Sequence, residues 1–368
     1  MPVTDRSSIM SDLKFIFVHG AGGWGRYDAI DRLVPYWGML NGSLISFLRR
    51  RGYDCYGASV APSGSIWVRA CELYAQISGT RTDYGAVHSI RENRERYGRD
   101  YSGDPLIPEW NENTRLVLLG HSMGGATVRL LAHLLEHGDE EERSSTPDHE
   151  LSDLFRGNMK GRVHAVMTLA APTNGASSLD MITDPAFDAD AVPVPFWSRI
   201  TMRILGLRLN TGRKQLKTTN TKRLSSIDRA LKQNEYISTL PDVYYFCIAC
   251  SSTVRQPDGT QYPDSKKTEI LYYSRSIQIG RYTGVTPEGF VIDESWQEND
   301  GLVNTVSALA PVGAPQKPFD RKHIEKGIWN VMPVFDGDHM SVQGGLFHRR
   351  DVRWFYLDLL EMCRQLER

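Results

Sequence analysis

The most restrictive feature of this 368-residue chain is a glycine-rich turn between an apolar strand and an apolar helix. Arg115–Leu119 predicts a buried strand, and the apolar spacing of Thr127–Glu136 predicts a helix. The turn that follows the strand consists of Gly120, His121, Ser122, Met123 and Gly124. Because side chains around the serine would collide in so tight a turn, we expect its hydroxyl to project from the top of a sheet, near the positive end of a helix. A glycine-rich connection that merely contains a serine is the alternative, and the flanking strand and helix argue against it.

Short apolar runs alternate with helical patterns along most of the chain. Buried strands are predicted at Phe15–Val18, Tyr53–Val60, Leu116–Leu119, Val163–Leu169 and Val243–Ala249. Helices are predicted at Ser43–Arg51, Trp67–Ile77, Thr127–Glu136 and Val352–Leu366. This alternation is typical of an α/β fold whose mostly parallel central sheet carries helices on both faces. We expect a single domain over residues 1–368.

Two stretches interrupt the alternation. Asp139–Asp153 is charged and contains serine, threonine and proline, which predicts a solvated surface loop. Thr173–Asp242 is a long insertion with an apolar first half and a basic second half, which predicts a lid or cap over a site. A buried helical subdomain without a gating role is the alternative for the apolar half. The basic half is either a solvated face or a contact for phosphate headgroups or an interface.

Composition excludes several classes of protein. Lys plus Arg is 43 and Asp plus Glu is 44, which argues against a nucleic-acid-binding protein. The sequence contains no apolar run near the ~20 residues of a membrane helix. The first residues lack the apolar core of a signal peptide, so a cytoplasmic location is expected, or a secreted one if a leader has been removed. The five scattered cysteines fit a reduced protein, and Cys247-x-x-Cys250 lies in an apolar run typical of ordinary buried thiols.

A serine hydroxyl needs a base to act as a nucleophile, and chain order narrows the choice. In folds with this turn the acid and then the histidine follow the serine. His339 lies in a loop before the last predicted helix, whereas His323 and His348 lie among charged residues typical of a surface. The best acid is Asp300, in an Asn-Asp-Gly turn, and Asp336 and Asp338 compete with it because they are close to His339.

A glycine-rich segment after the first strand predicts a second part of the site. The strand Phe15–Val18 is followed by His19, Gly20, Ala21, Gly22, Gly23, Trp24 and Gly25. Glycines let the backbone approach a substrate closely, and an oxyanion hole needs two backbone N–H groups. We expect these from Ala21 and from Met123, the residue after the serine. A phosphate-binding loop is the weaker alternative, because no Gly-Lys-Ser/Thr is present.

Many segments in order resemble the α/β-hydrolase lipases of the staphylococcal and thermoalkalophilic bacillus type. The matching segments are His19-Gly20, Gly23–Arg26, Tyr36–Gly38, Arg69–Glu72, Tyr74–Gln76, Asp83–Ala86 with His88, Gly120–Gly124, Ala171-Pro172 with Gly175, Glu298–Gly301, Val303–Thr305, Gly327 with Trp329-Asn330, and Asp338-His339. The resemblance implies an α/β-hydrolase fold, a triad of Ser122, Asp300 and His339, and an oxyanion hole from Ala21 and Met123. It also implies hydrolysis of acyl-glycerol or related carboxyl esters.

The departures from this family predict that metals are absent. The family carries a zinc site of two aspartates and two histidines, and the chain keeps His88 but has Val68 and Arg94 at two other ligand positions. The family's calcium site uses carboxylates just after the catalytic histidine, where this chain has Ser341, Leu346 and Phe347. Calcium prefers several hard oxygen ligands. We therefore expect no metal and no cofactor, and a reshaped acyl pocket around Ala21 and Met123.

These features together predict a serine carboxylester hydrolase, a lipase or esterase that forms an acyl-enzyme on Ser122. A phospholipase, a thioesterase or an acyltransferase with the same triad is the alternative within enzymes, and an amidase is a weaker one. A hydrolase-fold protein that binds without turnover is the alternative outside them. The expected partner is a lipid or a small acyl ester, with transient contact to a lipid interface, and no nucleic acid.

Overall fold

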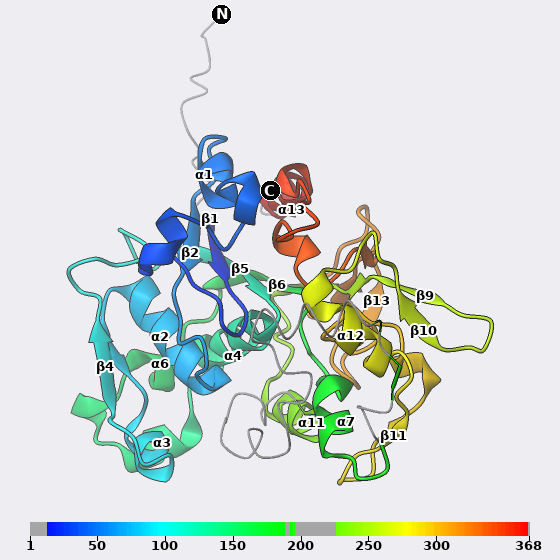
Figure 1. Cartoon of the computed structure of the whole chain (residues 1–368). Helices are drawn as coiled ribbons and strands as arrows, with labels where there is room; N and C mark the ends of the chain where they lie inside the picture. The colour runs from blue at the N-terminus through cyan, green and yellow to red at the C-terminus, as the bar shows by residue number, and fades with distance from the viewer. Residues whose placement is uncertain (1–12, 188–191, 194, 196–225, 367–368) are drawn as a thin grey trace, which may run out of the picture.

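Seven strands form the central sheet in the spatial order β13-β14-β7-β6-β5-β1-β2, and each neighbouring pair is parallel (Figure 1). Their bounds are β1 Leu13–Val18, β2 Cys55–Ala58, β5 Arg115–His121, β6 Val163–Leu169, β7 Tyr244–Ile248, β13 Gln316–Pro318 and β14 Trp329–Val331. The computed structural model describes residues 13–187, 192, 193, 195 and 226–366. The predicted α/β fold with a mostly parallel sheet is confirmed. β13 at the edge and its neighbour β14 are each three residues long, too short to have left a clear apolar run.

The central strands are apolar on both faces because both faces of the sheet are covered. Successive side chains of a strand point to opposite faces. In β1, Phe15 and Phe17 therefore enter one core, and Ile16 and Val18 enter the other. All four side chains are almost completely buried, and so the apolar runs identified the strands correctly.

Two pairs of helices supply the rest of these cores. α1 (Leu44–Arg49) and α13 (Arg353–Leu366) pack on the Phe17 face, and α2 (Ile66–Ser78) and α4 (Met123–His137) pack on the Val18 face. Figure 1 shows these two pairs on opposite sides of the sheet. Each lies within a few residues of the helix predicted from periodicity.

The predicted surface position of Asp139–Asp153 is confirmed, since most of its residues are exposed, but the prediction that it is a loop is wrong. This segment contains α5 (Glu140–Ser145), the 3-10 helix η3 (Asp148–Glu150) and the start of α6 (Asp153–Arg156). Asp139 caps α5 by accepting a hydrogen bond from the N–H of Glu142 at 2.9 Å. An Asp-x-x-Glu spacing is a helix-start signal, which the charged composition obscured.

Further elements lie outside the sheet. They are η1 Ala29–Arg32, η2 Met39–Asn41, β3 Arg81–Asp83, α3 Ala86–Arg91, β4 Tyr97–Asp100, α7 Ser177–Thr183, α11 Ile227–Tyr236, β8 Cys250–Ser251, β9 Thr253–Arg255, β10 Gln261–Pro263, α12 Ile270–Ile279, β11 Gly284–Val285, β12 Val291–Ile292, η4 Glu294–Trp296, β15 Phe335–Asp336 and η5 Ser341–Gln343. A small separate core joins α7, α11 and the end of α12 through Met181, Ile227 and Ile279. Half of the predicted lid or cap, which spans residues 173–242, falls on 188–191, 194 and 196–225 and so lies outside the described residues.

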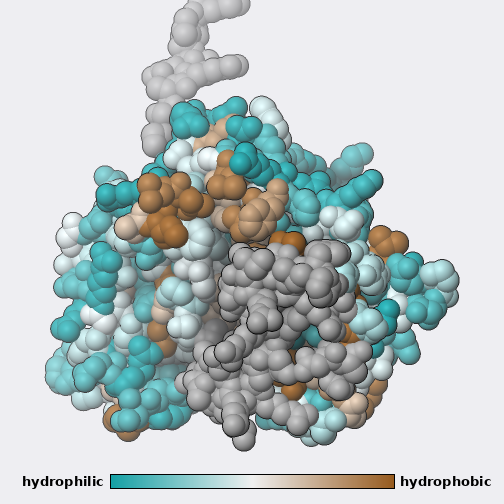
Figure 2. Space-filling view, viewed as in Figure 1, coloured by the Kyte–Doolittle hydropathy of each residue, from teal (hydrophilic) through white to brown (hydrophobic). Residues whose placement is uncertain are grey.

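Apolar side chains are also exposed near the two N-terminal 3-10 helices. Ile30, Leu33 and Leu40 are exposed there, as is Phe347 in the loop after His339. Asn41 Nδ2 donates to the main-chain oxygen of Gly344 at 2.9 Å, which ties these two regions together. Figure 2 shows apolar patches next to each other on this face of an otherwise largely hydrophilic surface.

All five cysteines are free and buried. Burial raises the pKa of the Cys247 thiol to about 12. The thiolate needed for redox or metal chemistry is therefore disfavoured, and the prediction of ordinary buried thiols is confirmed.

Replacing Phe17 by alanine tests how far the fold depends on its two cores. Phe17 is fully buried, with its ring centroid 5.1 Å from that of Trp37 and 5.7 Å from that of Tyr356. We expect Phe17→Ala to lower the free energy of unfolding by ~3–5 kcal/mol, because a cavity replaces these contacts. Urea denaturation followed by circular dichroism measures this change. Leu33→Ala, at a position 84% exposed, is the control, with an expected change below ~0.5 kcal/mol. Equal effects of the two changes would contradict the assignment of Phe17 to the core.

Candidate active site

Ser122 lies between β5 and α4 in a backbone conformation that only a tightly constrained turn maintains. Its φ is +54° and its ψ is −128°, which costs a non-glycine residue ~1–3 kcal/mol. A Cβ on Gly120 would lie 2.2 Å from the carbonyl oxygen of Gly124, and one on Gly124 would lie 2.3 Å from that of Val18. Both positions therefore require glycine. The N–H of Ser122 donates to the carbonyl oxygen of Leu169 at 2.8 Å, which fixes the turn against β6.

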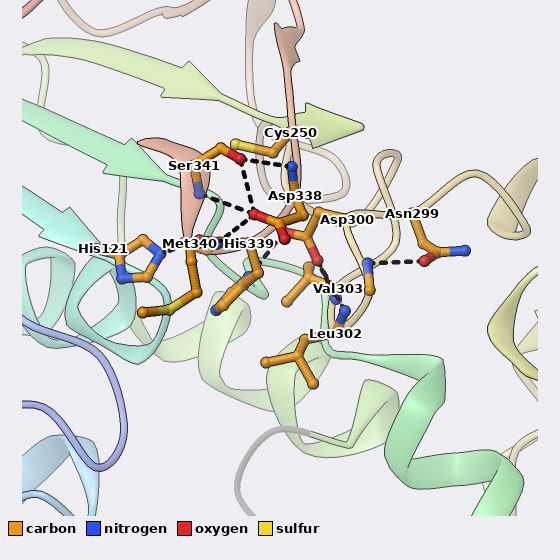
Figure 3. Close-up of polar contacts among 12 residues, drawn as sticks. His121, Cys250, Asn299, Asp300, Leu302, Val303, Asp338, His339, Met340 and Ser341 are labelled. Atoms are coloured by element: carbon orange, nitrogen blue, oxygen red, sulfur yellow. Dashed lines mark hydrogen bonds and ion pairs between the residues drawn. The ribbon is translucent and has the colours of Figure 1, made fainter. Parts of the chain in front are cut away.

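His339 and Asp300 form a buried pair (Figure 3). His339 Nδ1 lies 2.8 Å from Asp300 Oδ2, and the N–H of His339 donates to the carbonyl oxygen of Asp300 at 2.9 Å. The other carboxylate oxygen, Oδ1, accepts from the N–H groups of Leu302 and Val303 at 2.9 and 2.7 Å. Because an ionised carboxylate can only accept, the imidazole proton lies on Nδ1 and the lone pair on Nε2.

The structure separates the competing acids from this pair. Asp336 is exposed and lies 2.7 Å from Lys267 Nζ. Asp338 is buried, and burial raises its pKa to about 6, but its carboxylate accepts from Ser341 and from backbone N–H groups rather than from an imidazole. His323 is exposed beside Asp320.

A chain of hydrogen bonds brings the two halves of the site together. The N–H of Gly20 donates to Tyr36 Oη at 2.9 Å, and Tyr36 Oη lies 2.6 Å from His121 Nδ1. His121 Nε2 lies 2.8 Å from the carbonyl oxygen of His339 and therefore donates to it. Burial lowers the pKa of His121 well below its usual range, so the ring is neutral and Nδ1 accepts from Tyr36. Since Ser122 follows His121, this chain holds the turn against the loop that carries His339.

The glycine-rich loop after β1 lies directly on the turn. A Cβ on Gly20 would lie 2.8 Å from Ser122 Cβ. The N–H groups of Gly20 and Gly22 donate to Tyr36 and to Pro62. Within the described part of the chain, no hydrogen bond is found for the N–H of Ala21 or of Met123. An oxyanion hole needs N–H groups that are not already paired, so the assignment of Ala21 and Met123 to it stays a prediction.

A buried arginine fixes this glycine-rich loop through hydrogen bonds to its carbonyl oxygens. The guanidinium of Arg69 is completely buried and donates to the carbonyl oxygens of His19, Gly20 and Ala61 and to Thr127 Oγ1. Arg69 and Tyr36 lie in segments that resemble the lipases, but no role was predicted for either residue. The resemblance was the only sequence signal for them, because their hydrogen-bond partners are distant in the chain.

The chain is similar to known proteins in sequence and in fold. A family model described as "Lipase-like, C-terminal domain" matches residues 12–190. The lipase of Staphylococcus epidermidis is 31% identical over 359 residues, which cover 89% of this chain and 49% of that protein. Lipase 2 of Staphylococcus aureus is 32% identical over 361 residues, which cover 89% of this chain and 50% of that protein. The chain is therefore similar to the staphylococcal lipases over most of its own length. It spans about half the length of these curated relatives.

Solved structures at 26–29% sequence identity are similar to the fold of this chain. EstA from Clostridium botulinum superposes with a TM-score of 0.80 at 28% identity, covering 96% of this chain and 87% of that one. Staphylococcus hyicus lipase superposes with a TM-score of 0.78 at 26% identity, and the match covers 100% of both chains. Lipase 1 from Pelosinus fermentans gives 0.76 at 29% identity, covering 96% of this chain and 98% of that one.

The residues at the staphylococcal family's zinc positions do not fit zinc. The His88 ring stacks on Trp67 with a centroid distance of 3.7 Å and an interplanar angle of 3°. The guanidinium of Arg94 lies 3.8 Å from the ring centroid of Tyr84, so a cation occupies another ligand position. The described residues contain no group of three or more His, Cys, Asp or Glu side chains that could hold a metal ion.

The calcium positions of the staphylococcal family do not fit calcium either. The N–H groups of Leu346 and Phe347 point toward a single oxygen, Glu269 Oε1, at 2.7 and 2.6 Å. Calcium takes oxygen ligands, whereas N–H groups converge on anions. This part of the loop is therefore built around a carboxylate.

Tyr36→Phe tests the hydrogen-bond chain. The change leaves the buried N–H of Gly20 without its acceptor and His121 Nδ1 without its donor. We expect the free energy of unfolding to fall by ~1–3 kcal/mol, because unpaired buried polar groups are costly. Urea denaturation measures it, with Tyr97→Phe, at a tyrosine 43% exposed, as the matched control. An effect no larger than that of the control would show that the hydrogen bonds through Tyr36 contribute little to stability.

Proposed function

We propose that the protein is a serine carboxylester hydrolase, a lipase or esterase, with Ser122 as nucleophile, His339 as base and Asp300 as acid. The observation that carries this proposal is the buried His339–Asp300 pair, 2.8 Å apart, linked through His121 to the turn of Ser122. Similarity to proteins named lipases supports acyl-glycerol or other fatty-acyl esters as the substrate class. We further propose that the chain acts as a single unit, since the site takes residues from both ends of it.

In the first half of the proposed reaction, Ser122 Oγ attacks the ester carbonyl and His339 Nε2 takes the hydroxyl proton. Asp300 stabilises the imidazolium without taking a proton from it. The N–H groups of Ala21 and Met123 donate to the oxyanion of the tetrahedral intermediate. His339 then gives its proton to the departing alkoxide, the ester C–O bond breaks, and the acyl group stays on Ser122.

In the second half, water attacks the acyl-enzyme and His339 accepts one of its protons. The tetrahedral intermediate collapses, the proton returns to Ser122 Oγ, and the carboxylic acid leaves. An acyltransferase would use an alcohol in place of water, and a thioesterase would release a thiol in the first half. The alternatives therefore differ in the leaving group and the acceptor, not in the triad.

The exposed apolar residues supply a surface for the proposed lipid partner. Ile30, Leu33 and Leu40 follow the glycine-rich loop along the chain, and Phe347 lies in the loop after His339. All four are exposed and are named here the apolar rim. No helix among the described residues is long and apolar enough to cross a bilayer. We propose that the contact with lipid is adsorption through the exposed side chains of this rim.

The proposed chemistry is tested by hydrolysis of p-nitrophenyl esters of increasing acyl length. We expect Ser122→Ala to lower kcat by ~10⁴-fold or more and Asp300→Asn by ~10²–10⁴-fold, because the nucleophile and the imidazole orientation are lost. EDTA is expected to leave the wild-type rate unchanged. A long-chain optimum favours a lipase and a short-chain optimum an esterase.

Other outcomes would redirect the proposal. If folded wild-type protein hydrolyses no ester and a phosphonate probe does not label Ser122, a binding protein without turnover replaces the enzyme. If thioesters, glycerol or amides are used in preference, the corresponding alternative is correct. Loss of activity in EDTA would contradict the absence of a metal.

The apolar rim is tested by a paired substitution, Leu33→Ser with Phe347→Ser. We expect adsorption to phosphatidylcholine vesicles and turnover of an emulsified ester to fall ~5-fold or more, because apolar area available for burial is lost. Hydrolysis of a soluble short-chain ester is expected to change little. Ile90→Ser, at a residue 83% exposed on α3 and away from the site, is the matched control. Equal adsorption of the paired variant and the control would exclude this surface.

A further inference from the structure

Glu269 is a fully buried carboxylate that does not serve the helix it precedes. It occupies the N-cap position of α12, but its side chain makes no capping hydrogen bond to that helix. The side chain is 0% exposed and turns instead toward the loop after His339. A buried charge of this kind persists only where other groups compensate for the loss of water.

The compensation comes from the backbone of that loop. Glu269 Oε1 accepts from the N–H groups of Leu346, Phe347 and His348 at 2.7, 2.6 and 2.9 Å. Successive N–H groups that converge on one oxygen form an anion-binding nest. Glu269 Oε2 faces His348 Nδ1 at 3.9 Å, so the interaction that fixes this segment is made by the backbone.

Glu269 also holds the other end of the same loop. Its N–H donates to Asp338 Oδ2 at 2.6 Å. Asp338 Oδ1 in turn accepts from the N–H of Met340 and from the N–H and Oγ of Ser341, at 3.1, 3.0 and 2.8 Å. Glu269 therefore contacts the residue just before His339 and the segment just after η5.

The loop between these contacts has little regular structure of its own. It begins after β15, contains only η5, and turns at Gly344 and Gly345 with φ values of +127° and +68°. The Asp300 carboxylate fixes the Nδ1 side of the imidazole, but the main-chain position of His339 depends on how the loop is anchored. An imidazole misplaced by about 1 Å loses about 10²-fold in rate.

We propose that Glu269 is a positioning residue for His339, an internal carboxylate that anchors the base-bearing loop at the place where the resemblance to staphylococcal lipases implies calcium. This inference rests on the proposed function. It assigns to Glu269 a role in the rate of reaction, beyond its contribution to stability.

The experiment compares Glu269→Ala with a matched control, Glu142→Ala. Glu142 is also buried, at 1% exposure, and accepts from the N–H groups of Val87 and His88 at 3.2 and 2.8 Å. It ties α5 to α3, which Figure 1 shows far from α12. Both changes remove a buried acceptor, but only one of the two carboxylates holds the loop of His339.

The measured quantities are kcat and KM on a soluble short-chain p-nitrophenyl ester, with active enzyme titrated by a phosphonate. We expect Glu269→Ala to lower kcat ~30-fold with KM changed by less than ~2-fold, since proton transfer suffers and substrate contacts do not. Glu142→Ala is expected to keep kcat within ~2-fold even if it melts at a similarly lowered temperature. Hydrogen exchange of residues 338–350 is expected to rise in the first variant only.

Two further variants keep the test decisive if Glu269→Ala does not fold. Glu269→Gln keeps an acceptor oxygen at the same reach, and we expect its kcat within ~3-fold of wild type. Glu269→Asp keeps the charge but is one methylene shorter, and we expect a loss of ~10-fold. The order Gln above Asp shows that reach to the three N–H groups matters more than charge.

Equal kcat for Glu269→Ala and Glu142→Ala in folded protein would overturn the proposal and leave Glu269 a stabilising residue only. So would an aspartate variant as active as the glutamine variant. Failure of the proposed function looks different, because the wild type itself would then show neither ester turnover nor phosphonate labelling.

Discussion

The hydrogen bond from His121 Nε2 to the carbonyl oxygen of His339 is the contact on which the rest of the site depends. It joins a turn at the end of β5 to a loop more than two hundred residues later in the chain. Through Tyr36 the same side chain reaches Gly20, in the loop after β1. Parallel strands place their carboxyl ends at one edge of the sheet, and so three loops meet there. The chain of hydrogen bonds then sets their mutual distances.

The hydrogen bonds that link Gly20, Tyr36, His121 and His339 are buried, and breaking any one of them is therefore costly. Hydrogen bonds strengthen one another in a medium of low dielectric, but an unpaired group there is costly, so the network is stable only when it is complete. Burial lowers the pKa of His19 to about 4, and that of His121 lies well below its usual range. Both rings therefore stay neutral at physiological pH and keep the donors and acceptors that the neighbouring loops need. The same rigid surroundings maintain the strained backbone of Ser122.

Hydrogen bonds from N–H groups to buried carboxylates fix other parts of the loops around the site. Asp300 accepts from an imidazole and from two backbone N–H groups, and Glu269 accepts from three. In the loop after His339, an oxygen of Glu269 accepts from the N–H groups at the place where the resemblance implies calcium. A loop without regular structure needs a fixed centre around which its polar groups converge, and here that centre is a buried acceptor.

The sequence alone determined the central strands, the helices on either face and the turn of Ser122, because these arise from contacts between near neighbours. Alternating burial requires apolar runs, and the clash of a Cβ with nearby backbone requires Gly120 and Gly124. The Asn-Asp-Gly turn and the resemblance favoured Asp300 as the acid, but no local pattern excluded Asp338, which is adjacent to His339 in sequence. Only the tertiary structure decided that Asp300, thirty-nine residues away, faces the imidazole and that Glu269 holds the loop after it. These partners meet because folding brings distant loops to one edge of a sheet, and such a meeting leaves no periodic pattern in the chain.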